Sequence, residues 1–305
     1  MTISSTNSVV FLMGPTASGK TELALEMYNQ LDASLISVDS ALIYRGMDIG
    51  TAKPSKVTLE NYPHALIDIC EPDESFSVNQ FVSLAKQHIE SALNAGKLPI
   101  LVGGTSFYFN ALEHGLSKLP ESTKDSRKYF NDRLKNQGSE KLHSQLLKID
   151  QKSATRIHPN DSQRVTRALE VFHLSGVTLS ELQGNKNENK LNHEIKKIIL
   201  MPERSELHQR IEKRFIEMIK DGFLDEVETL RKNKNLNLDL ASMRCVGYRQ
   251  AWNYFDGLYS KQEMIEKAII ATRQLCKRQS TWLRNESNAL ILKETNIDKA
   301  INFLQ

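Results

Sequence analysis

The stretch of this chain that is most informative about its architecture is Val9-Val-Phe-Leu-Met-Gly-Pro-Thr-Ala-Ser-Gly-Lys-Thr21. Its first five residues are apolar and stop at a glycine, which is typical of a buried parallel strand. The remainder, from Gly14 to Thr21, matches the phosphate-binding pattern Gly-x-x-x-x-Gly-Lys-Thr. A helix is expected at 20–30, so the pattern has the preceding strand and the following helix that a phosphate-binding loop requires.

Strands and helices continue to alternate after this loop. Short apolar runs predict further strands at 35–38, 64–70 and 98–102. The best-marked helix begins after Ser77, which forms a capping-box pattern with Gln80, and it ends at Gly96. Together these patterns predict a P-loop NTPase-like α/β core, in which helices cover both faces of a parallel sheet in three layers.

The second half of the chain has a different pattern. Strand signals are absent between 119 and 191, where the sequence is charged and helical and where the polar stretch 183–192 predicts a loop. A strand is expected again at 197–201, followed by amphipathic helices, the last of which reaches Arg284. We therefore predict a discontinuous core, 1–118 and 192–305, that carries a mainly helical insertion at 119–191.

The composition is that of an ordinary soluble enzyme of 305 residues. Forty Lys and Arg against 37 Asp and Glu give a net charge of only +3, so a surface for a polyanion would have to come from local clustering. The three cysteines have no metal-ligand spacing and suit a reducing cytosol. No export signal or membrane-spanning run is found, and we expect a cytoplasmic protein without a membrane partner.

The phosphate loop predicts a ligand that carries two linked phosphates. The expected diphosphate-binding residues are Gly14, Pro15, Thr16, Ala17, Ser18, Gly19, Lys20 and Thr21. Backbone N–H groups would surround the anion, Lys20 would add a positive charge, and Thr21 would ligate Mg²⁺. The loop alone does not identify the reaction. A GTPase is disfavoured, because 185–188 and 233–236 lack the Asp of the Asn-Lys-x-Asp element, but a small-molecule kinase and an RNA-binding module remain open.

Eight strings occur in order along nearly the whole chain and resemble the bacterial tRNA dimethylallyltransferase family. They are 14–21, 36–44, 47–53, 102–105, 157–160, 163–170, 244–250 and 272–279. The resemblance implies transfer of the dimethylallyl group of dimethylallyl diphosphate to the exocyclic amine of the adenosine at tRNA position 37. It also implies the anticodon stem-loop as partner. From the phosphate loop we expect Mg²⁺ as cofactor, and we expect a monomeric enzyme.

Two residues at strand ends are candidates for catalysis. Asp39 follows the strand at 35–38, where open α/β sheets bind ligands, and we expect it to act as general base on the adenine amine. Alternatively, it caps the next turn, or it organises Mg²⁺ in a kinase. Thr105 follows the strand at 98–102; the resemblance implies contact with the target nucleotide, and helix capping is the alternative.

Basic residues at helical spacing are the candidates for tRNA contacts. Arg164 and Arg167 share one face of a helix beginning near 160–162, and Arg273, Lys277 and Arg284 share a stripe of the last helix, although such stripes are often only solvated faces. Tyr248 either stacks on a base or packs in the core. With the resemblance, the expected contacts are Asp39, Ser40, Ala41, Leu42, Thr105, Arg127, Gln163, Arg164, Val165, Thr166, Arg167, Arg244, Cys245, Val246, Gly247, Tyr248, Arg249, Arg273, Lys277, Arg278 and Arg284.

Overall fold

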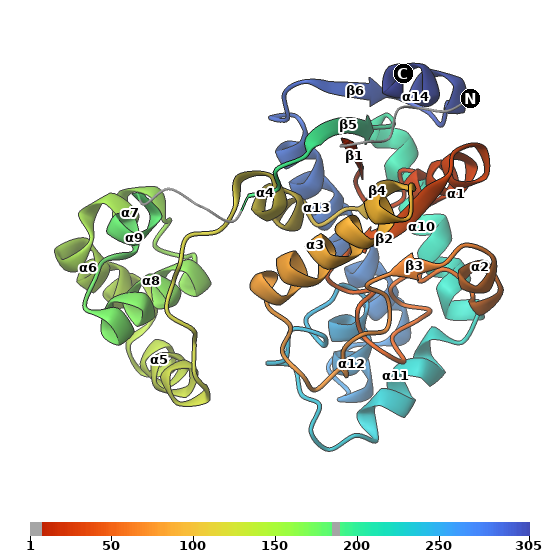
Figure 1. Ribbon diagram of the computed structural model, residues 1–305. Helices are drawn as coiled ribbons and strands as arrows, with labels where there is room; N and C mark the ends of the chain where they lie inside the picture. The colour runs from red at the N-terminus through yellow and green to blue at the C-terminus, as the bar shows by residue number, and fades with distance from the viewer. Residues whose placement is uncertain (1–7, 185–189) are drawn as a thin grey trace. The chain divides into compact units, whose positions relative to one another are not determined.

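The computed structural model describes residues 8–184 and 190–305, and these residues form one parallel sheet flanked by helices (Figure 1). The strands are β1 Ser8–Met13, β2 Ala33–Val38, β3 His64–Ala65, β4 Leu98–Gly103, β5 Glu194–Leu200 and β6 Ala289–Leu292. Their order is β3-β2-β4-β1-β5-β6, with every pair parallel. The carboxyl ends of β1, β2 and β4 are therefore neighbours, and the α/β class expected from the sequence is confirmed.

The central strand β1 is apolar from Val9 to Met13 because both of its faces are covered. Val10 and Leu12 join the core cluster that contains Leu23 and Met27 of the following helix. Phe11 points to the opposite face, where its ring centroid lies 5.0 Å from that of Phe109. This two-residue alternation, with apolar side chains on both faces, is what a parallel strand between helical layers requires.

Helices make up most of the remaining core. Those of the sheet-containing unit are α1 Lys20–Gln30, α2 Lys56–Asn61, α3 Val78–Asn94, α4 Ser106–His114, α10 Arg204–Lys220, α11 Phe223–Arg231, α12 Tyr248–Phe255, α13 Lys261–Leu283 and α14 Ile297–Leu304. The predicted start of α3 is confirmed, since Ser77 and Gln80 form a reciprocal capping box. A second apolar cluster packs α10, α11, α12 and α13 against the segment that contains Ile43, Tyr44 and Met47.

Three details of the sequence prediction were wrong. The strand expected at 64–70 is only two residues long, because Leu66 and Asp68 have φ angles of 66° and 55° in the left-handed region, where a strand cannot continue. The helix that ends near Arg284 is not the last element, since β6 and α14 follow it. The loop expected at 183–192 begins inside a helix, while its residues 185–189 lie outside the described part of the chain.

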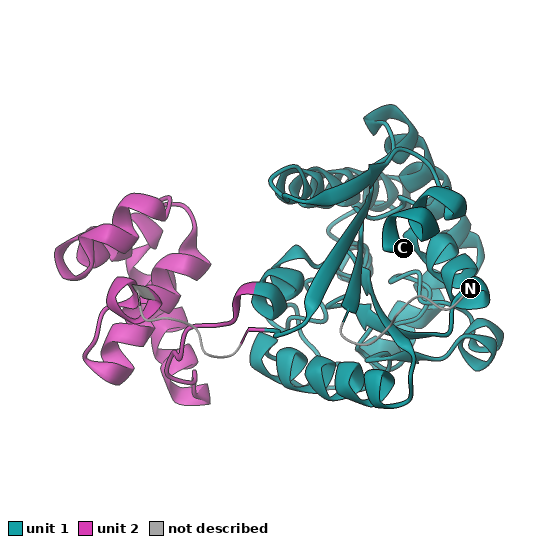
Figure 2. Ribbon diagram, turned by 45° about the horizontal axis from the view of Figure 1, so that its top comes forward, with its two compact units in different colours: residues 1–113, 191–305 teal, residues 114–190 magenta. Residues whose placement is uncertain are grey.

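The chain divides into two compact units, one of residues 1–113 and 191–305 and one of residues 114–190 (Figure 2). The smaller unit contains α5 Lys124–Gln137, α6 Ser139–Ile149, α7 Gln151–Arg156, α8 Ser162–Ser175 and α9 Leu179–Gly184. Its own core includes Phe130, Leu142, Leu146, Val165 and Leu169. Each unit thus has an apolar core of its own.

The described residues also bear on two expectations from composition. None of their helices is long and apolar enough to cross a membrane. The cysteines are free thiols, with Cys70 and Cys276 buried. Within the same residues no group of three or more His, Cys, Asp or Glu side chains is arranged to hold a metal ion by itself.

Candidate active site and nucleic-acid interface

The phosphate loop connects the end of β1 to the first turn of α1. Its backbone is strongly bent, with φ angles of 65° at Ala17 and 95° at Gly19. Gly19 is the N-cap residue of α1 and provides no side-chain hydrogen bond to the helix. The first N–H groups of a helix lack intrahelical partners, and here they are not satisfied by a cap. The loop therefore has the uncapped helix N-terminus that favours an anion.

Three basic side chains contact the loop, one from the start of α1 and two from α10. The Nζ of Lys20 donates a hydrogen bond to the carbonyl oxygen of Pro15 at 3.2 Å. From α10, Arg214 donates to the hydroxyl of Thr16, and Arg210 donates to the carbonyl oxygen of Ser18 at 3.3 Å. Neither arginine was predicted from the sequence. Their spacing of four residues places both on one helix face, which was the available signal.

Burial shifts the pKa values of two of these groups, Lys20 and Arg214. It lowers the pKa of Lys20 to about 8, a shift that the Asp39 carboxylate opposes and the Arg214 guanidinium increases. Burial also lowers the pKa of Arg214, again opposed by Asp39. Lys20, Arg214 and Asp39 therefore interact electrostatically around the loop. A bound anion would favour the charged form of Lys20 and so would bind together with a proton.

Gln279 of α13 joins the phosphate loop to the end of β4. Its Oε1 accepts a hydrogen bond from the Thr16 N–H at 2.9 Å, and its Nε2 donates to the carbonyl oxygen of Gly104 at 2.8 Å. The sequence analysis assigned no role to Gln279, although it lies in one of the strings that resemble the family. Because the two partners lie 263 and 175 residues away, only the fold brings this bridge together.

Asp39 and Thr105 meet at the ends of the paired strands β2 and β4. The Oδ1 of Asp39 accepts a hydrogen bond from the Ala41 N–H at 2.9 Å, so the turn-capping alternative is found in the structure. Among the described residues, no donor reaches the other carboxylate oxygen. The hydroxyl of Thr105 accepts from the Ser40 N–H at 3.0 Å rather than from the helix that follows it. Thr105 therefore holds the turn that carries Asp39.

The segment 244–249 also lies near Asp39, but its residues differ in accessibility. Burial raises the pKa of the Cys245 thiol to about 12, with the Asp39 carboxylate as the second cause. Arg244 and Arg249 are exposed. Tyr248, however, is fully buried, and its hydroxyl donates to Glu226 at 2.5 Å. The expectation that Tyr248 stacks on a base is wrong for this structure, and its core-packing alternative is confirmed.

In the smaller unit, the predicted arginines surround a buried carboxylate. Glu170 accepts hydrogen bonds from the hydroxyls of Ser122 and Ser126 and from Arg167, which lies 2.7 Å away. Ser122 in turn accepts from Arg127 at 3.1 Å. Arg127 and Arg167, 40 positions apart, thus belong to one network.

Access to nucleic acid differs among the predicted residues of α8. Arg164 is 70% exposed at its side chain and is the most accessible of its basic residues. Thr166 donates its hydroxyl to the carbonyl oxygen of Ser162, and Gln163 is exposed. The side chain of Val165 is fully buried in the helical core and is not exposed to a nucleic acid in this structure.

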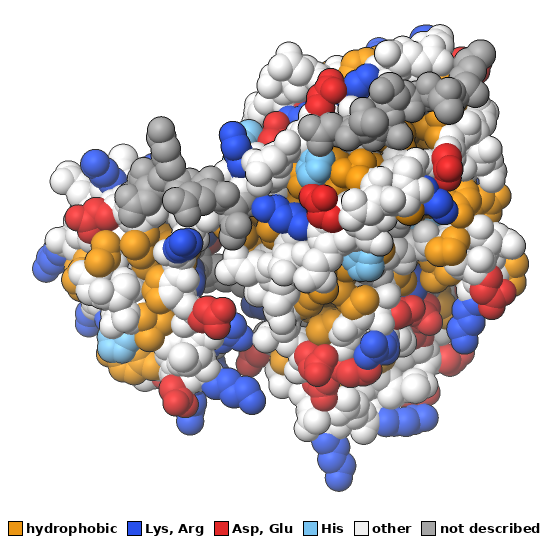
Figure 3. Space-filling view, viewed as in Figure 1, with side chains coloured by type: hydrophobic (Ala, Val, Ile, Leu, Met, Phe, Trp, Pro, Cys, Tyr) orange, Lys and Arg blue, Asp and Glu red, His pale blue; other side chains and the backbone are white. Residues whose placement is uncertain are grey.

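One residue of the basic stripe of α13 forms an ion pair within the protein, and the others are exposed. Arg273 is held by an ion pair of 2.6 Å to Glu212 of α10 and does not project freely. Lys277, Arg278 and Arg284 are exposed. On the face that Figure 3 shows, Lys and Arg side chains are interspersed with Asp and Glu and form no continuous basic patch, consistent with the small net charge.

The chain is similar to proteins of a known family. Residues 42–286 match the family model described as IPP transferase. A protein of Ruthia magnifica subsp. Calyptogena magnifica, named tRNA dimethylallyltransferase, is 62% identical over 304 residues, which cover 100% of this chain and 99% of the relative.

Solved structures are also similar. The full-length tRNA isopentenylpyrophosphate transferase from Bacillus halodurans is 36% identical with a TM-score of 0.70, over 97% of this chain and 93% of that one. A eukaryotic dimethylallyltransferase described as acting on tRNA has a TM-score of 0.75 and 26% identity, over 91% of this chain and 70% of that one. The family resemblance inferred from the sequence strings is therefore confirmed, and the chain belongs to the IPP transferase family.

Proposed function

We propose that this protein transfers the dimethylallyl group of dimethylallyl diphosphate to the exocyclic amine of the adenosine at tRNA position 37, producing N6-isopentenyladenosine and diphosphate. One observation carries the proposal within the family. Two partly buried cations, Lys20 and Arg214, bind the phosphate loop near Asp39, which follows β2 of the same sheet. A site for an anionic leaving group is thereby next to a candidate base.

The phosphate loop serves the leaving group in this reaction. As the bond between the allylic carbon and the diphosphate oxygen breaks, negative charge develops on the diphosphate. Lys20, Arg214 and the first N–H groups of α1 are positioned to bind that charge. Because Lys20 and Arg214 are partly buried, their interaction with the diphosphate is weakened less by water than it would be at a fully exposed surface.

Asp39 serves the nucleophile. Its Oδ1 is fixed by the Ala41 N–H, which leaves Oδ2 to accept a hydrogen bond from the exocyclic amine of adenine. When the nitrogen forms its bond to the allylic carbon, Asp39 takes the proton that the nitrogen loses. The products are the alkylated base, diphosphate and one proton on the carboxylate. Thr105 supports this step by holding Ser40, the residue that follows the base.

A divalent cation fits the residues of the loop, and we propose Mg²⁺. Thr21 is exposed in the first turn of α1, where its hydroxyl is available as a ligand, and Mg²⁺ commonly binds through one or two protein groups plus substrate phosphates. When bound, the ion would supply further neutralisation of the leaving diphosphate. This arrangement needs no larger cluster of carboxylates, and none occurs among the described residues.

The proposed tRNA surface consists of the predicted residues that are exposed. In the sheet-containing unit these are Ser40, Arg244, Arg249, Lys277, Arg278 and Arg284. In the smaller unit these are Arg127, Gln163 and Arg164, and Arg127 also donates a hydrogen bond to Ser122. We propose that both surfaces bind the anticodon stem-loop, since a base inside a folded loop must be extruded before it reaches Asp39. We further propose a monomeric, cytoplasmic enzyme, with which the free thiols agree.

The test supplies radiolabelled dimethylallyl diphosphate and tRNA without any nucleoside triphosphate. The proposal predicts label in the tRNA at the adenosine beside the anticodon. A tRNA in which that adenosine is replaced by guanosine serves as the control and stays unlabelled. A requirement for ATP, or a lack of label in the unaltered tRNA, would refute the proposed reaction and favour a kinase or a binding protein.

A further inference from the structure

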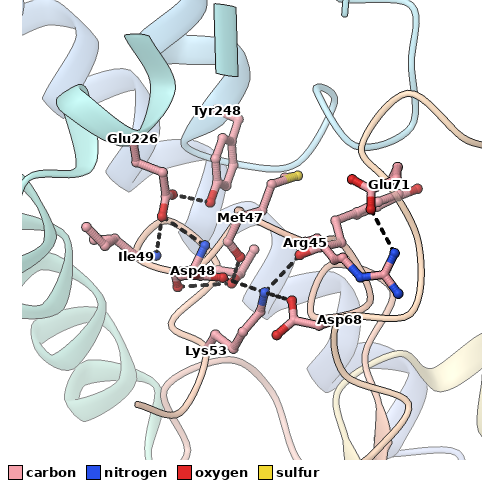
Figure 4. A network of polar contacts seen from close by, with 11 residues as sticks. Arg45, Met47, Asp48, Ile49, Lys53, Asp68, Glu71, Glu226 and Tyr248 are labelled. Atoms are coloured by element: carbon pink, nitrogen blue, oxygen red, sulfur yellow. Dashed lines mark hydrogen bonds and ion pairs between the residues drawn. The ribbon is translucent and has the colours of Figure 1, made fainter. Parts of the chain in front are cut away.

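One carboxylate outside the predicted site binds an unusually large number of donors. The Oε2 of Glu226, in α11, accepts the backbone N–H groups of Asp48 and Ile49 at 2.8 Å and 2.7 Å (Figure 4). Its Oε1 accepts the N–H of Gly50 at 3.2 Å and the hydroxyl of Tyr248 at 2.5 Å. Three consecutive backbone donors from a segment almost 180 residues away thus depend on a single side chain.

The segment held in this way, residues 47–53, is a loop of constrained shape. A Cβ atom at Gly50 would lie 2.3 Å from Phe223 and 2.6 Å from Tyr248, so the loop packs directly against α11 and the start of α12. Ala52 has a φ angle of 57°, a conformation that a residue other than glycine rarely adopts. Strained backbone of this kind persists where surrounding contacts hold it, and it is frequent near functional sites.

The other end of the loop is fixed by Lys53, whose side chain is only 3% exposed. Its Nζ lies 2.6 Å from Asp48 and 2.5 Å from Asp68, and it donates to the carbonyl oxygen of Tyr44 at 2.8 Å (Figure 4). Tyr44 belongs to the segment that begins with Asp39. The 47–53 loop is therefore tied both to the turn that carries the proposed base and, through Glu226, to the C-terminal helices.

This loop forms one wall of a cavity of about 440 Å³. Its lining is mixed. Apolar side chains are contributed by Ile49, Ala52, Leu59 and Met218, and charged ones by Arg214, two lysines and the carboxylates of Asp48, Asp68, Glu217 and Asp221. Arg214 also donates to Thr16 of the phosphate loop, so the cavity adjoins the proposed diphosphate site. The apolar part of this lining, beside the arginine of the proposed diphosphate site, is where a small apolar group attached to a charged head would lie, while the carboxylates disfavour the charged head itself there.

We propose that Glu226 is a positioning residue for the allylic diphosphate donor. It holds the 47–53 loop so that Ile49 and Ala52 keep their distance from α10 and preserve the shape of the cavity beside Arg214. Glu226 makes no contact with the phosphate loop and does not take part in the chemical step. The inference rests on the proposed function for the identity of the donor.

Replacing Glu226 by Gln changes the number of acceptors without changing the size of the side chain. The single amide oxygen can accept from Asp48 and Ile49, but the NH₂ group then faces the N–H of Gly50, which loses its acceptor. A suitable control is Glu228→Gln, because Glu228 is exposed on the same helix and makes no hydrogen bond or ion pair with the described residues.

The experiment measures donor binding without tRNA, by calorimetry with dimethylallyl diphosphate and with inorganic diphosphate, which lacks the apolar group. For E226Q we expect the Kd of dimethylallyl diphosphate to rise about tenfold, while the Kd of inorganic diphosphate stays within twofold. In transfer assays the KM for the donor should rise similarly, with kcat at saturating donor within threefold. E228Q should match the wild type in every measurement.

Two results would overturn the inference: an unchanged donor Kd in E226Q, or equal weakening of donor and inorganic diphosphate. If E226Q does not fold, Tyr248→Phe, which removes one donor and keeps the three N–H bonds, should weaken donor binding selectively by about threefold. A Tyr248→Phe protein with wild-type donor affinity would then refute the role. Because these readouts need no tRNA, they stand apart from the transfer assay, whose failure would instead refute the proposed reaction.

Discussion

The lowered pKa of Lys20 predicts that diphosphate binding weakens as the pH rises from 7 to 9. In the free protein, burial brings the pKa of Lys20 down to about 8, although the nearby Asp39 carboxylate and Cys276 thiol act in the opposite direction and Arg214 adds to the shift. A diphosphate binds the charged form. Binding therefore requires Lys20 to gain a proton whenever the pH exceeds this pKa.

The size of the effect follows from the protonated fraction of Lys20. With a pKa of about 8, roughly nine tenths of the side chains are charged at pH 7 and roughly one tenth at pH 9. The apparent Kd should consequently rise about tenfold over this range, equivalent to about 1.4 kcal/mol. A lysine with the ordinary pKa of 10.5 would give almost no change. At pH 8, binding should take up about half a proton per diphosphate.

The stability of the unliganded protein depends on pH with the opposite sign: diphosphate binding weakens as the pH rises, whereas the contribution of Lys20 to stability increases. Because the folded pKa lies below the unfolded value, the unfolded chain binds more protons between about pH 8 and 10.5, and the contribution of Lys20 to stability rises with pH there.

Calorimetry with inorganic diphosphate, in buffers of different ionisation enthalpy, measures both the Kd and the proton uptake. Lys20→Arg is the control, since its guanidinium stays charged throughout and its ratio of Kd at pH 9 to Kd at pH 7 reports only the titration of diphosphate itself. A wild-type ratio equal to that of Lys20→Arg, together with no proton uptake at pH 8, would refute the reasoning.

Three further predictions follow from the site. Asp39→Asn should slow single-turnover transfer by about 10²- to 10⁴-fold, while the Kd for tRNA stays within threefold of the wild type. A loss of tRNA affinity as large as the loss of transfer rate would instead make Asp39 a binding residue. Gly103→Ala should lower the free energy of unfolding in urea by about 1 to 3 kcal/mol, because its Cβ would lie 2.0 Å from the Val38 carbonyl oxygen. In Gly104→Ala the added Cβ would lie 2.6 Å from the Gln279 side-chain amide, which can shift more easily than backbone, so the loss of unfolding free energy should be smaller. A larger loss for Gly104→Ala than for Gly103→Ala would count against this account. Lys277→Gln combined with Arg278→Gln should weaken tRNA binding and reduce its salt slope by about one to two, while Lys261→Gln, at the other end of the same helix, should leave the slope unchanged.

The fold class was predictable because its main signals are local. The apolar run before Gly14, the glycine pattern of the loop and the capping box at Ser77 each involve neighbouring residues whose backbone preferences are known. Short elements with weak patterns were missed. The strand β6 is four residues long and has only one buried side chain, so its sequence differs little from that of a loop.

Residues of the candidate site that depend on distant contacts were not predictable. Arg214 and Gln279 reach Thr16 from 198 and 263 residues away, and no spacing in the sequence reports such a contact. The helical pattern around Tyr248 is the same whether its ring faces solvent or the core. Only the packing of Phe223 and the carboxylate of Glu226 explain its burial.

The sequence by itself therefore determined the phosphate loop, the position of Asp39 at a strand end and the family, since each depends on local order along the chain. The tertiary structure alone decided which cations bind that loop, which predicted arginines are available to nucleic acid and which carboxylate holds the 47–53 loop. The physical reason is that charge, burial and hydrogen bonding act through space, so a side chain acquires its role from whatever the fold places beside it.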